Sequence, residues 1–273
     1  MSHYSNQVVL ITGASSGIGA ALAREFSRRG AVVVLCARRV ERLERLASEL
    51  QARGGQALAT ACDVTKDSDL EAAVARTIER FGRLDVAIAN AGFGVAGRVD
   101  SLTIEDFRRQ FETNVFGVLR TVYATLPELK KTRGVLALMG SVSGHLSSPG
   151  MAPYSMSKFA VRALAEALRA ELRRDGVGVV LLSPGFVESD IRRTDNDGRV
   201  HEGARDPVPG WLVMRADRAA RQMVCAIRHR KPEAIITGHG RLLVFLDRYA
   251  RGLVRFAADR AMRGRTPPRP DPS

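Results

Sequence analysis

The fold class of this 273-residue chain is decided by the stretch Val8-Val9-Leu10-Ile11-Thr12-Gly13-Ala14-Ser15-Ser16-Gly17-Ile18-Gly19. A short apolar run ends at Thr12, and three glycines then lead into a helical pattern. Glycines let the backbone approach a pyrophosphate without an intervening Cβ, and the free amides of a helix N-terminus favour the anion. The stretch predicts a strand, a dinucleotide-binding loop and a helix, with cofactor contacts from Gly13, Ser15, Ser16, Gly17, Ile18 and Gly19.

The rest of the chain alternates short apolar runs with longer amphipathic stretches. Strand-like runs lie at 8–12, 32–37, 56–61, 84–89, 135–139, 177–182 and 234–237, and helical stretches at 17–29, 40–52, 68–81, 104–126, 153–174 and 216–229. The runs are almost continuously apolar, which is typical of strands covered on both faces. The pattern predicts an α/β fold with a doubly wound, Rossmann-type parallel sheet of about seven strands and helices on both faces.

Two segments interrupt this alternation. We expect residues 1–239 to form one nucleotide-binding and catalytic domain, with a lid loop at about 186–214, which is too long for an ordinary connection. A basic amphipathic helix is predicted for 240–265. It could cover the substrate pocket, pack in a dimer or lie on an anionic membrane surface, and we favour packing on this protein. Residues 266–273 are proline-rich and are expected to be disordered.

Composition limits the cellular setting and the partners. No apolar run approaches the ~20 residues that span a bilayer. The three cysteines, Cys36, Cys62 and Cys225, are scattered and lack metal-ligand spacing, which suits a reducing cytoplasm. We therefore also expect no metal. The net charge of +13 is spread along the chain, so we expect no nucleic-acid partner. The sequence favours a cytoplasmic protein with possible peripheral membrane contact through its C-terminal helix.

Cofactor choice is read at the end of the second predicted strand, where a carboxylate would bind the ribose 2′-hydroxyl of NAD(H). Here the sequence is Cys36-Ala37-Arg38-Arg39, without an acid. Arginine makes charge-assisted contacts with phosphate, so Arg38 and Arg39 favour NADP(H) over NAD(H). Asp63-Val64 follows the third strand, where Asp63 would lie near the adenine amino group or cap the next helix.

A second set of residues can perform acid–base chemistry. Tyr154 and Lys158 lie four residues apart at the start of a predicted helix and therefore share one face. A free tyrosine titrates near ~10, and a neighbouring ammonium lowers that pKa by stabilising the phenolate. Ser141 ends the fifth predicted strand, where its hydroxyl can hold a substrate oxygen beside the phenol. The three predict proton transfer at a carbonyl or carbinol oxygen, next to a hydride-carrying nucleotide.

Over roughly residues 6–238 the chain resembles the short-chain dehydrogenase/reductase family, in its NADP(H)-preferring subgroup. The resemblance rests on the glycine loop, on Ser141, Tyr154 and Lys158, and on Asn90-Ala91-Gly92, Asn114 and Pro184-Gly185. It implies that Asn90 steadies the sheet and borders the adenine ribose, that Ala91 and Gly92 contact the cofactor, and that Asn114 keeps a water in a proton relay behind Lys158. It also implies cofactor contacts from Tyr154, Lys158, Pro184, Gly185, Val187 and Ser189.

The resemblance implies an NADP-dependent oxidoreductase that interconverts a ketone or aldehyde and an alcohol. Candidate substrate contacts are His145, Phe93, Phe186 and Trp211. Their largely apolar character favours a lipid-like, steroid-like or aromatic carbonyl compound. Two alternatives remain, a 3-oxoacyl-(acyl-carrier-protein) reductase-like enzyme and a non-enzymatic NADP(H)-binding sensor. A homo-oligomer, either a dimer or a tetramer, is expected.

We predict that Tyr154→Phe retains cofactor binding and loses almost all turnover, because the ring keeps its shape and loses the proton that it donates. The measurements are the dissociation constant for the nucleotide and the rate of carbonyl reduction. A variant that reduces carbonyls at nearly the wild-type rate would contradict the assignment.

Overall fold

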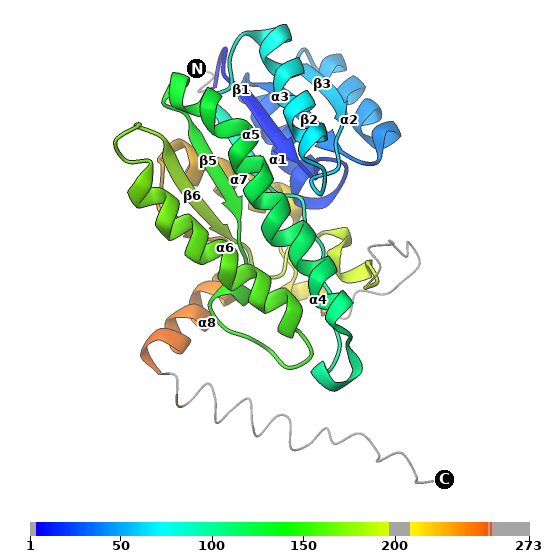
Figure 1. Ribbon diagram of the computed structural model, residues 1–273, viewed down its shortest axis with the longest axis vertical. Coiled ribbons are helices and arrows are strands. Elements are labelled where there is room, and N and C mark those ends of the chain that lie inside the picture. The colour runs from blue at the N-terminus through cyan, green and yellow to red at the C-terminus, as the bar shows by residue number, and fades with distance from the viewer. Residues whose placement is uncertain (1–3, 197–207, 251, 253–273) are drawn as a thin grey trace.

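The computed structural model describes residues 4–196, 208–250 and 252. Its strands form one parallel sheet in the order β3-β2-β1-β4-β5-β6-β7 (Figure 1). The strands are β1 (Val8–Thr12), β2 (Val32–Ala37), β3 (Gln56–Ala61), β4 (Val86–Ala89), β5 (Val135–Met139), β6 (Gly178–Ser183) and β7 (Glu233–Ile235). The predicted doubly wound parallel sheet is confirmed.

Helices cover both faces of the sheet because the strands are apolar on both sides. One face packs against α1 (Gly17–Arg28), α2 (Val40–Ala52) and α7 (Ala216–Arg228), and the other against α3 (Asp67–Phe81), α5 (Gly117–Thr132) and α6 (Ala152–Glu171). Along β1, Val9 and Ile11 enter the first core and Val8 and Leu10 enter the second. The period-2 alternation of a strand therefore divides one apolar run between two cores.

The strand order reverses direction between β1 and β4. From β1 the chain adds β2 and β3 on one side, and it then returns to add β4 to β7 on the other. Loops that leave β1 and β4 at their carboxyl ends consequently turn in opposite directions and open a crevice between them. This crevice is where ligands bind in open α/β sheets.

The prediction of a single helix over residues 104–126 is wrong in two respects. It divides into α4 (Ile104–Phe111), a π-helical turn (Glu112–Phe116) and α5. The chain also remains helical through Pro127, as far as Thr132. Proline removes one helical hydrogen bond, here to the carbonyl of Tyr123, whose residue is 70% exposed. Water can satisfy that carbonyl, so the helix continues.

The C-terminal helix is described only in its first part. Helix α8 (Gly238–Tyr249) begins at the N-cap Thr237, whose Oγ1 accepts a hydrogen bond from the amide of Gly240 at 3.2 Å. Leu242, Phe245 and Tyr249 are 58%, 58% and 70% exposed, so this face does not pack on the described body of its own subunit.

Several expectations fall outside the described residues. These are most of the helix expected beyond Tyr249, the tail at 266–273, and the part of the expected lid at 197–207. The domain limits therefore stay a prediction. In the residues that are described, no helix has both the length and the apolar character needed to cross a membrane. The three cysteines are free thiols.

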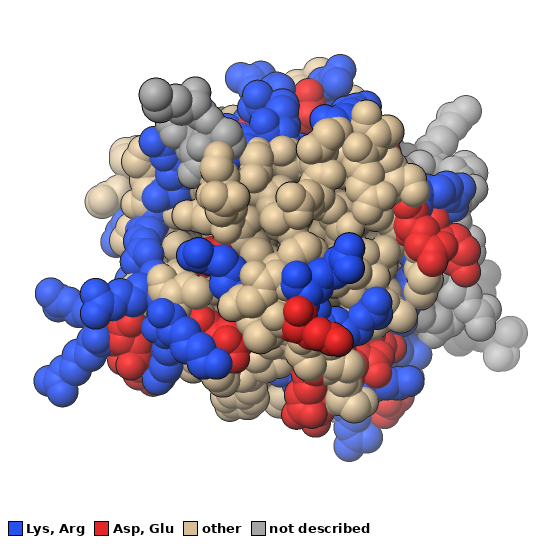
Figure 2. Space-filling model, turned by 90° about the horizontal axis from the view of Figure 1, so that it is seen from above, with Lys and Arg blue, Asp and Glu red and all other residues tan. Residues whose placement is uncertain are grey.

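The described basic side chains on the face seen in Figure 2 do not form one continuous patch. Basic side chains lie in several groups there, and acidic side chains lie beside many of them. Elsewhere in the described chain Arg24 pairs with Glu49 at 2.8 Å and Lys130 pairs with Asp175 at 2.9 Å. A nucleic acid is bound by a continuous basic stripe. That no nucleic acid binds stays a prediction.

Candidate active site

The crevice at the carboxyl ends of β1 and β4 holds a cleft with a volume of about 770 Å³. Both of the motif groups singled out in the sequence line it. These are Gly13, Ser15, Ser16, Gly17, Ile18, Gly19, Arg38, Arg39, Asp63, Val64, Asn90, Ala91, Gly92, Phe93, Ser141, Tyr154, Lys158, Pro184, Gly185, Val187 and Ser189. Residues that follow strands β1 to β6 therefore converge on one cavity.

The glycine loop leaves room where a side chain would clash. Gly13 and Gly17 have left-handed φ values of 66° and 52°. A Cβ at Gly19 would lie 2.7 Å from Asn90 Nδ2, which is closer than side chains are found. That Nδ2 donates hydrogen bonds to the carbonyl oxygens of Thr12 at 2.8 Å and Gly13 at 3.2 Å. Asn90 thus ties the end of β4 to the loop after β1.

Arginines gather at the end of the cleft beside β2. Arg39 Nη2 donates to Ser15 Oγ at 3.0 Å and to Ser16 Oγ at 2.8 Å. Arg38 lines the same end and is exposed. The cleft is therefore lined by two arginines at its end beside β2, next to the glycine loop.

Two residues of this cluster were not identified from the sequence. Arg42, on the first turn of α2, lines the cleft, and its Nη1 lies 3.6 Å from Asp190 Oδ2. The same carboxylate lies 3.9 Å from Arg39 Nη2. Helical spacing would have indicated Arg42, which follows Arg39 by three residues on the same side of α2. No local signal indicated Asp190, which reaches the arginines from a distant loop.

Asp63 does not cap the next helix. Its Oδ1 accepts hydrogen bonds from the amide of Thr65 at 3.0 Å and from the hydroxyl of Thr65 at 2.9 Å. Helix α3 begins only at Asp67, after the N-cap Lys66. The capping alternative is therefore wrong. Asp63 lines the cleft, and its contact with adenine stays a prediction.

Tyr154 and Lys158 lie on the first turns of α6, with Lys158 behind the phenol. Lys158 is 4% exposed, and its Nζ donates a hydrogen bond to the carbonyl oxygen of Met139 at 2.8 Å. Nζ is 5.7 Å from the centre of the Tyr154 ring. Burial lowers the pKa of the Lys158 ammonium to about 8. Lys158 thus remains mostly charged at neutral pH.

Ser141 lies between β5 and a short 3₁₀ turn (Val142–Gly144). Its Oγ accepts a hydrogen bond from the amide of Ser143 at 3.1 Å, which fixes the side chain at the cleft wall. One lone pair is used by this bond. The hydroxyl can therefore still donate its proton to an oxygen atom in the cleft.

Asn114 lies behind the cleft, in the π-helical turn, and is fully buried. Its Oδ1 accepts from the amide of Phe93 at 3.1 Å, and its Nδ2 donates to the carbonyl of Phe93 at 3.0 Å. Nδ2 also lies 3.3 Å from Ser157 Oγ, which donates to the carbonyl of Tyr154 at 2.7 Å. Asn114 thus joins the loop after β4 to α6. Its contact with a relay water stays a prediction.

Of the expected substrate contacts, only Phe93 lines the cleft. His145 is buried and pairs with Glu233 and Arg162. The ring of Phe186 stacks on that of His239, with 5.3 Å between their centres. Trp211 is 83% exposed.

The substrate contacts expected of His145, Phe186 and Trp211 lie outside the lining of this cleft, and they stay predictions. Local sequence showed only that these residues follow strands that end at the cleft. It did not show that His145 turns behind the wall, or that Trp211 faces solvent.

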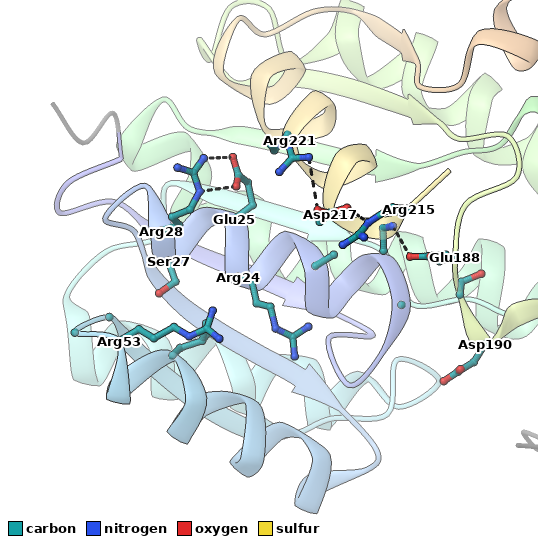
Figure 3. Close-up of a pocket in the computed structure, with 17 residues that line it drawn as sticks. Arg24, Glu25, Ser27, Arg28, Arg53, Glu188, Asp190, Arg215, Asp217 and Arg221 are labelled. Carbon is teal, nitrogen blue, oxygen red and sulfur yellow. Dashed lines mark hydrogen bonds and ion pairs between the residues drawn. The ribbon is translucent and has the colours of Figure 1, made fainter. Parts of the chain in front are cut away.

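A second hollow, of about 700 Å³, lies behind the glycine loop between α1 and α7 (Figure 3). In Figure 3, Arg28 points to Glu25 and Arg221 points to Asp217, at 2.9 Å and 3.6 Å. The described residues that line this hollow include no histidine, cysteine, lysine or tyrosine. No set of three potential ligands in the described residues could hold a metal ion. The chemistry is therefore assigned to the first cleft.

Comparisons with known proteins agree with this geometry. A family model described as short chain dehydrogenase matches residues 7–200. The chain is 34% identical to 11-beta-hydroxysteroid dehydrogenase A of Sesamum indicum over 227 residues. The matched segment covers 81% of this chain and 65% of that protein.

Solved structures show the same fold. An alcohol dehydrogenase from the archaeon Thermococcus sibiricus, complexed with 5-hydroxy-NADP, has a TM-score of 0.74 and 33% identity, over 84% of this chain and 95% of that one. A short chain dehydrogenase/reductase from Burkholderia phymatum in complex with NAD has a TM-score of 0.81 and 26% identity, over 100% of both chains. The chain belongs to the short-chain dehydrogenase/reductase family and is an oxidoreductase of that family.

The buried ammonium of Lys158 gives a stability prediction. Its pKa falls from 10.5 to about 8 on folding, so at pH 7 burial of the charge opposes folding. We expect Lys158→Met to stabilise the protein at pH 7 by about 2 kcal/mol, after the loss of the Met139 hydrogen bond is allowed for. Thermal unfolding measures the change.

The pH dependence has a definite sign. Between pH 8 and 10.5 the unfolded chain binds more protons at Lys158, so wild-type stability rises with pH and the advantage of Lys158→Met shrinks. Lys131→Met is the matched control, because Lys131 is an exposed lysine paired with Glu128. A stabilisation that is equal in both variants, or that grows above pH 8, would refute the burial argument.

Proposed function

We propose that this protein is an NADP(H)-dependent enzyme that interconverts a ketone or aldehyde and an alcohol on a hydrophobic substrate. The observation that carries the proposal is that one cleft is lined by the glycine loop, the arginine cluster, and Ser141, Tyr154 and Lys158. A nucleotide on the loop would extend toward the tyrosine, because both lie along the same edge of the sheet.

The residues present fit a dinucleotide cofactor. A Cβ at Gly13 would lie 2.8 Å from the Cα of Ala91, and a Cβ at Gly17 would lie 3.1 Å from the Cβ of Ser189. Because these glycines have no side chain, the loop packs closely on its neighbours at the N-terminus of α1, where backbone amides favour a pyrophosphate. When bound, the cofactor supplies or accepts a hydride at the substrate carbon.

The protein's own groups handle the proton. In the reduction, Tyr154 donates its phenolic proton to the substrate oxygen, and Ser141 donates a hydrogen bond to the same oxygen as negative charge develops. After this transfer Tyr154 is a phenolate, and the positive charge of the Lys158 ammonium stabilises it. Asn114 fixes the first turns of α6, because its amide contacts Ser157, whose hydroxyl donates a hydrogen bond to the carbonyl oxygen of Tyr154. In the oxidation, the same groups act in reverse.

The preference for NADP(H) over NAD(H) rests on Arg38, Arg39 and Arg42. A 2′-phosphate would place its charge beside three guanidinium groups, and the residues that directly follow β2 are arginines rather than an acid. Asp190, which lies 3.6 Å from Arg42, comes from the segment after β6. The relative from Thermococcus sibiricus holds an NADP derivative and the one from Burkholderia phymatum holds NAD. The family therefore uses both cofactors, and the arginines support the choice proposed here.

A hydrophobic substrate is supported by the surroundings of Tyr154. A Cβ placed on Gly94 would lie 3.7 Å from Tyr154 Cδ2 and 3.8 Å from Ile191 Cγ1. The ring of Tyr154 and the apolar side chain of Ile191 therefore both lie beside the backbone of Gly94. Phe93 and Met139 also line this end. A relative whose name is 11-beta-hydroxysteroid dehydrogenase A supports a steroid-like carbonyl as one candidate.

The alternative of a 3-oxoacyl-(acyl-carrier-protein) reductase-like activity is supported by the net charge of +13, which suits an acidic carrier. The non-enzymatic sensor is disfavoured, because the acid–base residues all reach the cleft. The homo-oligomer, the membrane contact and the cytoplasmic location stay predictions.

The test is NADPH oxidation over a panel of steroid, retinoid, aliphatic and acyl-carrier ketones. We expect turnover with one or more of the apolar ketones, and none above background with Tyr154→Phe. Turnover confined to the acyl-carrier ketone would favour the alternative. NADPH binding without turnover on any member would favour the sensor.

Cofactor preference gives a separate prediction. Arg39→Ala should raise the dissociation constant for NADPH about 10-fold or more and leave that for NADH within about twofold, because only NADPH offers the 2′-phosphate. Fluorescence titration measures both constants. Arg45→Ala is the matched control, since Arg45 lies on the same helix, is exposed and does not line the cleft. Equal losses for both nucleotides would reject the assignment.

A further inference from the structure

Behind the wall of the cleft, three side chains form a chain of polar contacts that the mechanism above does not use. His145 Nε2 lies 2.7 Å from Glu233 Oε1, and His145 Nδ1 lies 3.1 Å from Arg162 Nη1. Only 6% of the His145 side chain is exposed. His145 does not line the described cleft.

The donor and acceptor roles in this chain are fixed by chemistry. A guanidinium group has only donors, so Arg162 donates to Nδ1, which must carry a lone pair. The proton of a neutral His145 is then on Nε2, and Nε2 donates to the Glu233 carboxylate. Glu233 Oε1 also accepts a hydrogen bond from Ser183 Oγ at 3.0 Å.

The Glu233 carboxylate is held charged by its neighbours. Burial alone would raise its pKa, but the hydrogen bonds from His145 and Ser183 and the charge of Arg162 together lower it. The polar groups that burial would otherwise leave unpaired are therefore satisfied by one another. Replacement of His145 by an apolar residue would leave Glu233 and Arg162 each without one partner.

The same contacts join two elements that line the cleft, the turn at Ser141 and α6, to the edge strand β7. His145 follows the 3₁₀ turn that begins at Ser141, Arg162 is one helical turn beyond Lys158 on α6, and Glu233 begins β7. A Cβ placed on Gly144 would lie 2.8 Å from the carbonyl oxygen of Lys158, so the turn rests directly on α6.

Through Ser183, the same contacts also reach the end of β6. Ser183 is buried and immediately precedes Pro184, whose carbonyl oxygen accepts a hydrogen bond from the amide of Val142 at 2.9 Å. The turn that carries Ser141 is thus held from α6 by Arg162 and from the β6–β7 edge by Glu233, with His145 between them.

We propose that His145 is a positioning residue that, through Arg162 and Glu233, sets the Ser141 hydroxyl against Tyr154 and Lys158 for proton transfer. The inference rests on the proposed oxidoreductase function. A purely structural role would lower stability or expression and would leave the contribution of Ser141 to the rate unchanged. A positioning role makes that contribution depend on His145.

The test is a double-mutant cycle on the full-length protein, with kcat, KM and the NADPH dissociation constant measured on the best ketone of the panel. We expect His145→Phe to lower kcat roughly 10- to 100-fold, because a displacement of about 1 Å has such an effect. NADPH binding should change less than about twofold. Ser141→Ala should lower kcat about 100-fold in the wild type and less than about 10-fold in the His145→Phe background.

His145→Gln is the rescue variant, because its amide offers one donor and one acceptor as neutral histidine does. It should recover most of the lost kcat. His229→Gln is the matched control, since His229 is an exposed histidine at the end of α7, and it should leave kcat unchanged. Glu233→Met gives a second cycle with Ser141→Ala, in case His145→Phe does not fold.

Three results would overturn the inference. One is the same fold-loss from Ser141→Ala in both backgrounds, another is a kcat of His145→Phe near the wild-type value, and the third is no recovery with His145→Gln. In each of these cases the wild type still turns over the ketone, and the proposed function stands. A wild type that binds NADPH and reduces no ketone would instead refute the proposed function, and this inference with it.

Discussion

The hydrogen bonds from the Asn90 amide to the carbonyl oxygens of Thr12 and Gly13 hold the two central strands together where the cleft opens. The sheet reverses its strand order at this point, so the loops on either side turn apart. Gly19 packs against the same amide, and a side chain there would push α1 away from the loop. The position of the cofactor groove relative to Tyr154 depends on this junction.

Helix α6 buries a charged group, the ammonium of Lys158. Lys158 is buried beside the ring of Tyr154, and this burial lowers the pKa of its ammonium. One bond to the carbonyl of Met139 replaces part of its lost hydration. The enzyme thus accepts a local loss of stability at the place where a charged group is needed.

The contacts that orient the site come from outside the cleft. Asn114 reaches Tyr154 through Ser157, and His145 lies between the Ser141 turn, α6 and β7. Neither residue lines the cleft. The π-helical turn around Asn114 widens the helix by one residue, which lets the amide point at the loop after β4 instead of along the helix. A rigid frame of this kind limits the displacement of the reacting groups.

Sequence alone determined the layer order, the glycine loop and the pairing of Tyr154 with Lys158. These depend on strand and helix periods and on spacing within one element, which neighbouring residues fix. Only the tertiary structure decided that Asp190 meets Arg39, that His145 pairs with Glu233, and that Trp211 faces solvent. Such contacts join segments far apart in the chain, and their partners are chosen by how the loops pack around the sheet.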